Sequence, residues 1–460
     1  MSKGHDVAVV GTGVVGLAVS WALLQRGLRV SVIGPRGGDH RGQASRAAGA
    51  MLSTFSEIEP GHDPSRVAVE TAERLAAHQM YPGWLDGLDA GQGQGTWVLA
   101  PAGRRACLDP IAAAARAAGH PAEQHDAGDI PGLAVPPESA AALWLPTEAS
   151  IDSHALLEAL TSAVARHPRA LWLDATAVTV EPGAVRCADG SAAAAGQIVI
   201  AAGAAIPSLL PEAGRPLGVP PVLAGRGVSL LLRAPALPLP HVVRTPNAAF
   251  ACGVHLVPRT GALYLGGTNR LTTSPDPEHR ATAGELAALI GDAMALLDHR
   301  LGAAEVLDTR MGLRPYTLDH LPLIGRTGNA AVLLATATYR CGVLLAPRLA
   351  ELIADEITVP GALDEHPYRV LRPMTVPGAE ATAGRAAADI MDHLLQGGGH
   401  LAPQAAAELA AFLPAALRAL LADPGSDRGD AALRRLWLAA PVQEVIPSLL
   451  ALAGRLETSR

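Results

Sequence analysis

DVAVVGTGVVGLAVSWALLQRGLRVSVIG, at residues 6–34, contains a strand pattern, a glycine-rich turn, an apolar helix pattern and a second strand pattern. DVAVV and LRVSVI are short apolar runs with β-branched residues, which are typical of parallel strands covered on both faces. GTGVVG lies between them and supplies the GxGxxG spacing at the start of the helix. This order predicts a βαβ unit that opens the chain.

Each glycine of this turn has a physical task in a dinucleotide site. Gly11 permits the tight turn, Gly13 lets a pyrophosphate approach the backbone, and Gly16 lets the helix pack close to the strand. The phosphates would then lie at the positive end of the helix, beside Val14 and Val15. The pattern predicts dinucleotide binding, and a purely structural glycine turn is the alternative.

The second strand ends without the acidic residue that usually binds the adenosine ribose in such folds. Gly34 occupies that position, and Pro35 and Arg36 follow it. Asp39 is five residues further on and is a candidate substitute. Arg36 offers another interpretation, because an arginine there suits the 2′-phosphate of NADP.

The composition describes a globular protein of two or three domains. The chain has 460 residues, of which 49% are hydrophobic and 17% charged, and its net charge of −7 argues against a general nucleic-acid binder. Lys3 is the only lysine in the sequence. An interior Schiff-base lysine and a GK[ST] phosphate loop are therefore excluded.

Cysteines and histidines give no metal-site pattern. The four cysteines form no CxxC pair and the 16 histidines form no HExxH, so we expect no metal, no disulfide framework and a reducing cytoplasm. An uncharged run of 18 residues at 7–24 is long enough to cross a membrane. Glycines interrupt this run and it belongs to the βαβ unit, so we expect no membrane span.

Further segments follow in a recognisable order. They are ASRAAGAML (44–52), IDSHALLEALTSAVAR (151–166), ATAVTV (175–180), QIVIAAGAAIPSLL (197–210), HLVPRTGALYLGGTNR (255–270), GLRPYTLDHLPLIG (312–325) and ATYRCGVLLAPRLAELIADEI (337–357). Together with the glycine turn they resemble the D-amino-acid oxidase family of FAD proteins, particularly its glycine oxidase and sarcosine oxidase-like branch. The resemblance covers about residues 1–360.

The resemblance implies noncovalently bound FAD and a set of residues around it. Some relatives attach FAD through a cysteine just before the GLRP motif, whereas Met311 is the residue nearby in this chain. The implied cofactor contacts, added to the glycine turn with Gly34 and Arg36, are Ala44, Ser45, Gly49, Ala50, Met51, Val178, Ala202, Gly203, Arg340, Cys341, Gly342, Val343 and Leu344.

Arg314 raises the question of what anion it meets, because a guanidinium is costly to bury without one. An internal ion pair, with Asp319 for example, is one answer. By resemblance, the arginine of GLRP binds the substrate carboxylate above the flavin, and Arg340 shares that carboxylate or acts as a gate. His255 stands where glycine oxidases have a tyrosine that contacts the carboxylate, and an ordinary strand histidine is the alternative.

Two departures affect the function that the resemblance implies. The loop before Arg340 has Ala337 and Thr338 where relatives have Gly-His. In addition, the chain has no lysine to place beside the flavin, which some relatives use to speed the oxygen reaction. We therefore expect either oxygen or another electron acceptor.

The fold implied by the resemblance is α/β, with a Rossmann-like FAD-binding domain interleaved with an antiparallel-sheet α+β substrate domain. We expect the FAD domain at 1–80, 145–220 and 300–361, and the substrate domain at 81–144 and 221–299. Residues 362–460 would form a linker and a helical extension, with helices at 384–396, 403–422 and 429–456. This extension either covers an apolar patch or docks a partner or second subunit.

The expected activity is FAD-dependent oxidation of the carbon–nitrogen bond of a small amino acid, glycine-like or N-substituted. Hydride transfer to flavin N5 needs no metal or strong nucleophile from the protein. The products would be an imine, its 2-oxo acid and, with oxygen, hydrogen peroxide. The alternatives are a flavoenzyme of the same fold that oxidises a different carboxylated amine, or a flavin-binding partner subunit without activity of its own.

Overall fold

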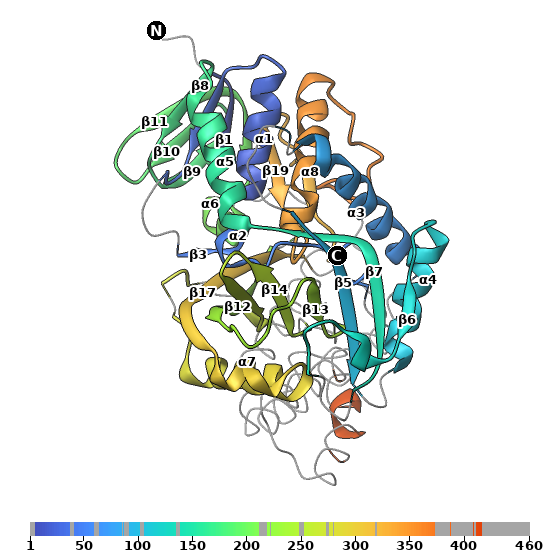
Figure 1. Ribbon diagram of the computed structural model, residues 1–460. Helices are drawn as coiled ribbons and strands as arrows, with labels where there is room; N and C mark the ends of the chain where they lie inside the picture. Colours follow the sequence, from blue (N-terminus) through green and yellow to red (C-terminus); the bar gives the residue numbers. More distant parts are fainter. Residues whose placement is uncertain are drawn as a thin grey trace.

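The computed structural model describes residues 5–36, 41–58, 64–84, 86, 92–101, 105–134, 139–210, 219–220, 222–247, 253–272, 276–278, 280–317, 320–372, 387, 408 and 411–415. Two sheets organise this part of the chain (Figure 1). The N-terminal βαβ unit predicted from the sequence is confirmed, as β1 (His5–Val10), α1 (Val14–Gln25) and β2 (Val30–Ile33).

The first sheet is mainly parallel. Within the described residues it has eight strands, with β1 near the middle of the order β18-β19-β11-β1-β2-β8. The neighbours of β1 and the pairs β11–β19 and β2–β8 are parallel, whereas β18, β9 and β10 add antiparallel pairs. The remaining strands are β8 (Ala170–Leu173), β9 (Ala177–Glu181), β10 (Ala184–Cys187), β11 (Ala192–Ile200), β18 (Leu323–Arg326) and β19 (Val332–Thr336).

Helices pack together over this parallel sheet. α1 contacts both α5 (Ser153–Arg166) and α8 (Gly342–Thr358), and α8 also contacts α3 (Pro64–Trp84). α5 buries Leu156, Leu160 and Val164 at helical spacing, and Asp152 caps its first turn by accepting bonds from two backbone N–H groups. The sequence period of 3.6 thus places one apolar stripe of α5 against the core.

The second sheet is mainly antiparallel and has eleven strands in the described part, in the order β3-β17-β12-β15-β14-β13-β5-β7-β4, with β16 beside β12 and β6 beside β7. Its strands are β3 (Gly42–Gln43), β4 (Met51–Leu52), β5 (Gln92–Pro101), β6 (Glu123–His125), β7 (Ser139–Ile151), β12 (Leu223–Arg233), β13 (Val242–Arg244), β14 (His255–Arg259), β15 (Ala262–Gly266), β16 (Arg270–Thr272) and β17 (Glu305–Tyr316).

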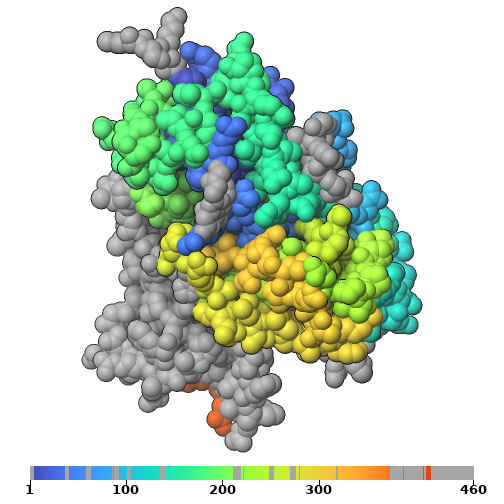
Figure 2. Space-filling model, turned by 60° about the vertical axis from the view of Figure 1, so that its left-hand side comes forward, coloured from blue at the N-terminus to red at the C-terminus, as the bar shows by residue number. Residues whose placement is uncertain are grey.

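The remaining helices of the described residues are α2 (Ala44–Ala47), α4 (Asp109–Ala117), α6 (Ile206–Leu209), α7 (Ala283–Leu296), and the 3₁₀ turns η1 (Arg105–Leu108), η2 (Ala127–Asp129), η3 (Gly203–Ala205) and η5 (His299–Ala303). α6 contacts β9 of the first sheet, whereas α7 contacts β12 of the second. α7 is followed closely by η5 along the chain. The space-filling view shows the blue and green part, which carries the first sheet, against the yellow part, which carries α7 (Figure 2).

The second sheet must curve, because both of its edges belong to one short segment. The path from β3 to β4 contains nine strands, which would span about 38 Å in a flat sheet. The chain from Gln43 to Met51 reaches at most about 29 Å, and α2 shortens it further. Residues 44–50 therefore cross the concave side of a curved sheet, next to the carboxyl ends of the first sheet's parallel strands.

β12 presents two different faces because alternate residues of a strand point to opposite sides. Arg226 points toward α7, where it pairs with Glu285. On the opposite side a Cβ on Gly225 would lie 2.6 Å from Asn269 Oδ1, and a Cβ on Gly227 would lie 2.0 Å from Arg314 Nη1. These two glycines therefore leave room for polar side chains that lie flat on the sheet.

The described residues include only a small part of the linker and helical extension predicted for 362–460. Residues 411–415 are helical, whereas most of the linker and of the helices expected after 384 lies outside the described residues. The domain boundaries and the role of the extension stay predictions. No helix in the described part of the chain is long and apolar enough to cross a membrane.

Gly227→Ala tests the close packing of Arg314 on β12. The added methyl group would overlap the guanidinium, and such overpacking costs about 1–3 kcal/mol. We expect a lower melting temperature than wild type by calorimetry. Gly291→Ala in α7 is the matched control, because a Cβ there meets nothing within 4 Å, and it should leave the melting temperature unchanged or raise it slightly. Equal melting temperatures for the two variants would contradict the packing.

Candidate functional site

The glycine turn between β1 and α1 is sterically obligatory. Gly11 has a φ of +116°, and a Cβ there would lie 2.4 Å from the carbonyl oxygen of Ala201. A Cβ on Gly16 would lie 2.1 Å from the carbonyl oxygen of Gly11. At Gly13 the nearest atom to the same position is Ser45 Oγ at 3.4 Å, an ordinary contact distance, so this glycine is less crowded than the other two. Two of the three glycines are thus required by close backbone packing, as in a dinucleotide turn.

The loop before and within α2 supplies polar groups at the start of α1. Ser45 Oγ accepts a hydrogen bond from Val14 N at 3.1 Å, and Gln43 Nε2 donates to the Thr12 carbonyl at 3.0 Å. Gln43 Oε1 and Arg46 Nε are buried and have no partner among the described residues. An arginine donor suits a phosphate and an amide oxygen suits a hydroxyl, so these groups fit the phosphate and sugar part of a dinucleotide.

Steric crowding explains why no acidic residue stands at the end of β2, where the ribose-binding acid is usual. Gly34 has a φ of +150°, and a Cβ there would lie 2.8 Å from Thr12 Cγ2, so an acidic side chain has no room. Asp174 follows β8, the neighbouring parallel strand, and its Oδ1 accepts a bond from Arg36 N at 3.0 Å. An acid therefore stands at the same sheet edge, but 138 residues further along the chain than Arg36.

Arg36 lies against Trp172, with its guanidinium carbon 5.6 Å from the ring centroid. Trp172 Nε1 in turn donates to the carbonyl of Gly34 at 3.0 Å. This position can be read either as a cation stacked on an aromatic ring or as one facing a 2′-phosphate. Asp39, the other sequence candidate, lies outside the described residues.

Of the other residues predicted to contact the nucleotide, two lie at the glycine turn and one does not. Ala202 caps η3 and its backbone N would lie 3.0 Å from a Cβ on Gly11, so Ala202 and Gly203 join the glycine turn. Val178 lies on β9, in the antiparallel addition to the first sheet, with 48% of its surface exposed. Its role remains a prediction.

The 44–51 loop is held by its carbonyl groups. Tyr264 Oη and Ser229 Oγ both donate to Ala47 O, at 2.7 and 3.0 Å, and Arg259 Nη2 donates to Gly49 O at 2.6 Å. These donors come from β15, β12 and β14 of the curved sheet. From the other side, α5 contributes Ser153 Oγ and His154 Nε2 to the carbonyls of Ala48 and Arg46.

The end of this loop brings further predicted residues close to the curved sheet. Ala50 has a positive φ of 49°, which is uncommon outside glycine. Met51 begins β4 and pairs with Ser150 of β7. A Cβ on Gly49 would lie 3.2 Å from His255 Nε2. The sequence-predicted Gly49, Ala50 and Met51 are therefore near His255.

Arg314 lies on β17 and donates from Nη1 to Thr268 O at 2.9 Å and to Asn269 Oδ1 at 3.1 Å. Both acceptors are neutral, and the structure shows no ion pair for Arg314 with any described residue; Asp319 is not among them. Gly312, two residues earlier, allows β17 to approach the loop, because a Cβ there would lie 2.8 Å from the Cα of Ala44. The GLRP motif thus places a charged fork beside the loop.

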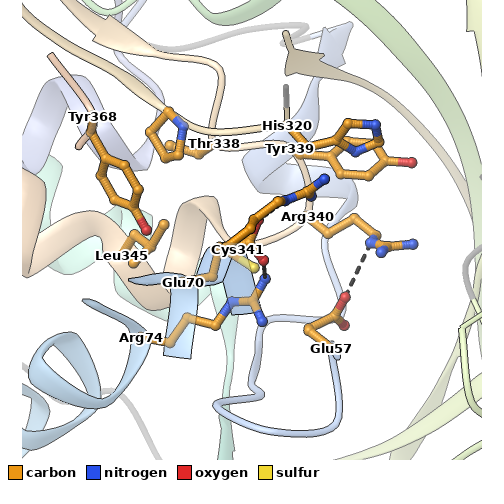
Figure 3. A pocket seen from close by; sticks show the side chains of 12 residues that line it. Glu57, Glu70, Arg74, His320, Thr338, Tyr339, Arg340, Cys341, Leu345 and Tyr368 are labelled. Carbon is orange, nitrogen blue, oxygen red and sulfur yellow. Dashed lines mark hydrogen bonds and ion pairs between the residues drawn. The ribbon is translucent and has the colours of Figure 1, made fainter. Parts of the chain in front are cut away.

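Arg340, the second predicted arginine, already has a counter-ion. Its Nε lies 3.0 Å from Glu57 Oε2, and Arg244 Nη1 lies 2.6 Å from Glu57 Oε1 (Figure 3 shows the first pair). Burial raises the pKa of the Glu57 carboxyl, but the Arg244 and Arg340 guanidiniums outweigh it and hold this pKa well below its usual range. Glu57 is therefore ionised and neutralises residues from two parts of the chain.

One tyrosine connects the two arginines. Asn269 Nδ2 donates to Tyr339 Oη at 2.6 Å, while Asn269 Oδ1 accepts from Arg314. On its other side, the Tyr339 ring lies 4.7 Å from the guanidinium carbon of Arg340. Tyr339 and Ala337 both have positive φ values, 47° and 58°, so this loop holds backbone conformations that are typical of functional sites.

His255 is buried and neutral. Its Nδ1 lies 2.8 Å from the carbonyl of Gly253, so this nitrogen carries the proton and donates it. Burial is the main reason that the pKa of His255 falls to about 4, and the charges of Arg244 and Arg314 act in the same direction. Nε2 is left as a hydrogen-bond acceptor. A neutral acceptor does not favour a carboxylate, so the geometry gives no support to the carboxylate contact expected for His255.

The segment after Arg340 forms the start of α8. Cys341 is the N-cap of this helix, and Gly342, Val343 and Leu344 form its first turn. A Cβ on Gly342 would lie 2.8 Å from Thr338 Oγ1, so the turn packs tightly on the strained loop. Tyr81 of α3 donates a hydrogen bond to the carbonyl of Val343. No group of residues suited to a metal ion occurs in the described part of the chain.

Comparisons with known proteins agree with this arrangement. The family model described as FAD dependent oxidoreductase matches residues 6–356. Glycine oxidase of Geobacillus kaustophilus is 28% identical over 393 residues, covering 83% of this chain and 100% of that protein. Its crystal structure superposes with a TM-score of 0.70 at 26% identity, over 81% of this chain and 100% of that one.

A bifunctional relative is longer than this chain. The ThiO/ThiG protein of Trichormus variabilis is 28% identical over 383 residues, which cover 77% of this chain and 52% of that protein. This chain therefore spans about half the length of that relative. The family match extends from β1 through both sheets to α8, so the chain belongs to the FAD-dependent oxidoreductase family and FAD is its cofactor.

Proposed function

We propose that the protein oxidises the carbon–nitrogen bond of a small amino acid, glycine-like or N-substituted, with noncovalently bound FAD. The observation that carries this proposal is Arg314, a half-buried guanidinium whose acceptors among the described residues are both neutral. A planar guanidinium can bind a carboxylate through two parallel hydrogen bonds. The similarity to proteins named glycine oxidase gives independent support.

The two arginines have unequal roles in this proposal. Arg340 is neutralised by Glu57, so binding a substrate carboxylate there would require that ion pair to rearrange. Arg314 needs no such rearrangement and is the primary carboxylate ligand. Arg340 then acts through Tyr339, which stacks against it and bonds to Asn269.

His255 would contact the nitrogen end of the substrate. Its Nε2 accepts a hydrogen bond from an amine N–H, because the proton of the neutral ring is on Nδ1. A carboxylate donor and an amine acceptor fix both ends of an amino acid and leave its Cα between them. FAD, when bound, supplies a hydride acceptor, and the resulting imine hydrolyses to a 2-oxo acid. Oxygen or another acceptor removes the electrons afterwards.

The cofactor site would combine the glycine turn with residues 43–46. Val14 N already donates to Ser45 Oγ, so the N–H of Val15 and the Ser45 and Arg46 side chains would hold the phosphates, and Gln43 Oε1 would accept from a hydroxyl of the cofactor. Asp174 would take the place of the missing acid after β2 and accept from the adenosine ribose. The carboxylate is exposed and already oriented by Arg36 N.

Arg314→Lys tests the substrate assignment. The purified holoprotein should keep its yellow flavin, yet anaerobic reduction by glycine or sarcosine should slow by about 30- to 150-fold, because a lost charge-assisted hydrogen bond costs roughly 2–3 kcal/mol. Arg310→Lys is the matched control on the same strand; Arg310 pairs with the exposed Asp308 at 2.8 Å, and the change should have little effect. Stopped-flow absorbance measures all three proteins. Equal rates would refute the role of Arg314, and a wild-type flavin that no amino acid or amine in a broad panel reduces would refute the proposed activity.

Asp174→Ala tests the ribose contact by affinity instead of turnover. We expect the dissociation constant of FAD for the apoprotein to rise by about tenfold or more, because a hydrogen bond to a charged group is lost. Fluorescence quenching of added FAD gives this constant directly. Asp189→Ala is the control, since Asp189 is also exposed and also accepts from a backbone N–H, that of Ser191. An unchanged FAD affinity in Asp174→Ala would remove Asp174 from the cofactor site.

A further inference from the structure

A small pocket, partly open to solvent, lies beside the site described above. Its walls are α3, the 338–341 segment and Tyr368, and none of its lining residues belongs to the glycine turn or the 44–51 loop. Figure 3 shows Arg74, Glu70 and Cys341 together at one side of this pocket, with Glu57 and Arg340 at another. Neither the oxidation chemistry nor the cofactor site accounts for the charges on α3.

α3 presents one carboxylate to two arginines. Glu70 Oε1 lies 2.7 Å from Arg66 Nε, and Glu70 Oε2 lies 2.7 Å from Arg74 Nη2. The three residues are one helical turn apart, so they share one face of the helix. This face is turned toward the pocket, because all three residues line it.

Arg74 has a nitrogen that this pairing does not use. Only 8% of the residue is exposed, and its Nη1 is buried with no hydrogen-bond partner among the described residues. An unsatisfied buried donor costs about 1–3 kcal/mol, and more when the group is charged. A ligand that accepted this hydrogen bond at the wall of the cavity would remove that cost.

The chemistry of the pocket favours an anion with planar oxygens. Arg74 is among its lining residues, and the planar guanidinium fork of an arginine matches a carboxylate in both charge and geometry. Tyr339 lines the pocket and bonds to Asn269, which accepts a hydrogen bond from Arg314. Tyr339 therefore connects the pocket lining to the partner of Arg314.

We propose that Arg74 binds a carboxylate in this pocket, as a second acid subsite beside Arg314. The carboxylate is either the second acid group of a dicarboxylated amine substrate or a separate carboxylic acid. The first case rests on the proposed function, since it makes the pocket part of the substrate site. The second case does not depend on it.

Calorimetric titration of the holoprotein with acetate tests the subsite without turnover. The Arg314→Lys variant is used as the background, so that the first acid site is weakened. Adding Arg74→Met should weaken the remaining acetate binding by at least tenfold. Adding Arg348→Met is the matched control, because Arg348 pairs with Glu73 at 2.9 Å and does not line the pocket; acetate binding should be unchanged. Equal acetate affinity in the Arg74 and Arg348 variants would overturn the proposal and assign the pocket to water.

Anaerobic flavin reduction distinguishes the two sources of the carboxylate. If the pocket takes the second acid group of a substrate, Arg74→Met should raise the half-saturating concentration of iminodiacetate relative to that of glycine by at least tenfold. If the pocket instead takes a separate acid, Arg74→Met should leave the ratio of the two half-saturating concentrations unchanged. Any change that acetate causes in the rate of flavin reduction by glycine or iminodiacetate should then be absent in this variant. Failure of either compound to reduce the flavin would count against the proposed function, and the acetate titration would still decide the subsite.

A second variant guards against misfolding, since Arg74→Met leaves Glu70 with a single arginine. Glu70→Gln combined with Arg74→Met removes both charges and leaves no unpaired carboxylate on α3. Its melting temperature is measured beside that of wild type. Loss of acetate binding in this variant with an intact melting transition supports the subsite, whereas retained acetate binding contradicts it.

Discussion

A half-buried guanidinium that has no counter-ion among the described residues is the constraint around which the site is built. Arg314 lies flat on β12, and its two acceptors in the described structure, Thr268 O and Asn269 Oδ1, are neutral. Glycine at 227 is what makes this position possible, because any side chain there would overlap the guanidinium. Desolvating a charge is costly, so the neutral hydrogen bonds hold the charge in place without cancelling it.

Unlike Arg314, the neighbouring Arg244 and Arg340 have a buried counter-ion. Arg244 and Arg340 converge on Glu57, and Asn247 Nδ2 donates to the same carboxylate at 3.0 Å. Because the pKa of Glu57 is lowered, the pair contributes stability that is present at neutral pH and is lost as pH falls through the folded-state pKa. Two arginines thus fix the architecture around Tyr339 while Arg314 stays available.

The curved sheet explains why this charge faces the loop that follows the βαβ unit. Both sheet edges are formed from 42–52, so the loop between them lies on the concave side, where Ser229 and Tyr264 hold the carbonyl of Ala47. A ring bound against that loop would be presented to the same face of β12 that carries Arg314. The position of substrate relative to cofactor is therefore a property of the sheet more than of any single loop contact.

The sequence predicted the parts of this arrangement that are local. The strand–glycine–helix–strand order needs only neighbouring residues, and the βαβ unit expected from it is confirmed. The fold class and the family, which were expected from the resemblance of several segments together, are confirmed as well. The role of Gly225 and Gly227 on β12 was not predicted, because it depends on packing against Asn269 and Arg314, the latter 87 positions later. The pairing of Glu57 with Arg244, 187 residues away, was not predictable, because many arginines were equally available to that glutamate. Asp174 was missed for the same reason, since only sheet order places it beside Gly34.

The charges that would bind the carboxylate of the proposed substrate would also affect the protonation of its amine. Burial lowers the pKa of His255, and the Arg244 and Arg314 charges lower it further, so the ring stays neutral at physiological pH. An amine held near His255 would experience the same burial and the same Arg244 and Arg314 charges, which disfavour its ammonium form, while the negative charge of Glu57 opposes them. Hydride departure from Cα requires the nitrogen lone pair, and therefore the neutral amine. The guanidinium that attracts the carboxylate would thus also help the amine to lose its proton, and no strong base would be needed beside the substrate.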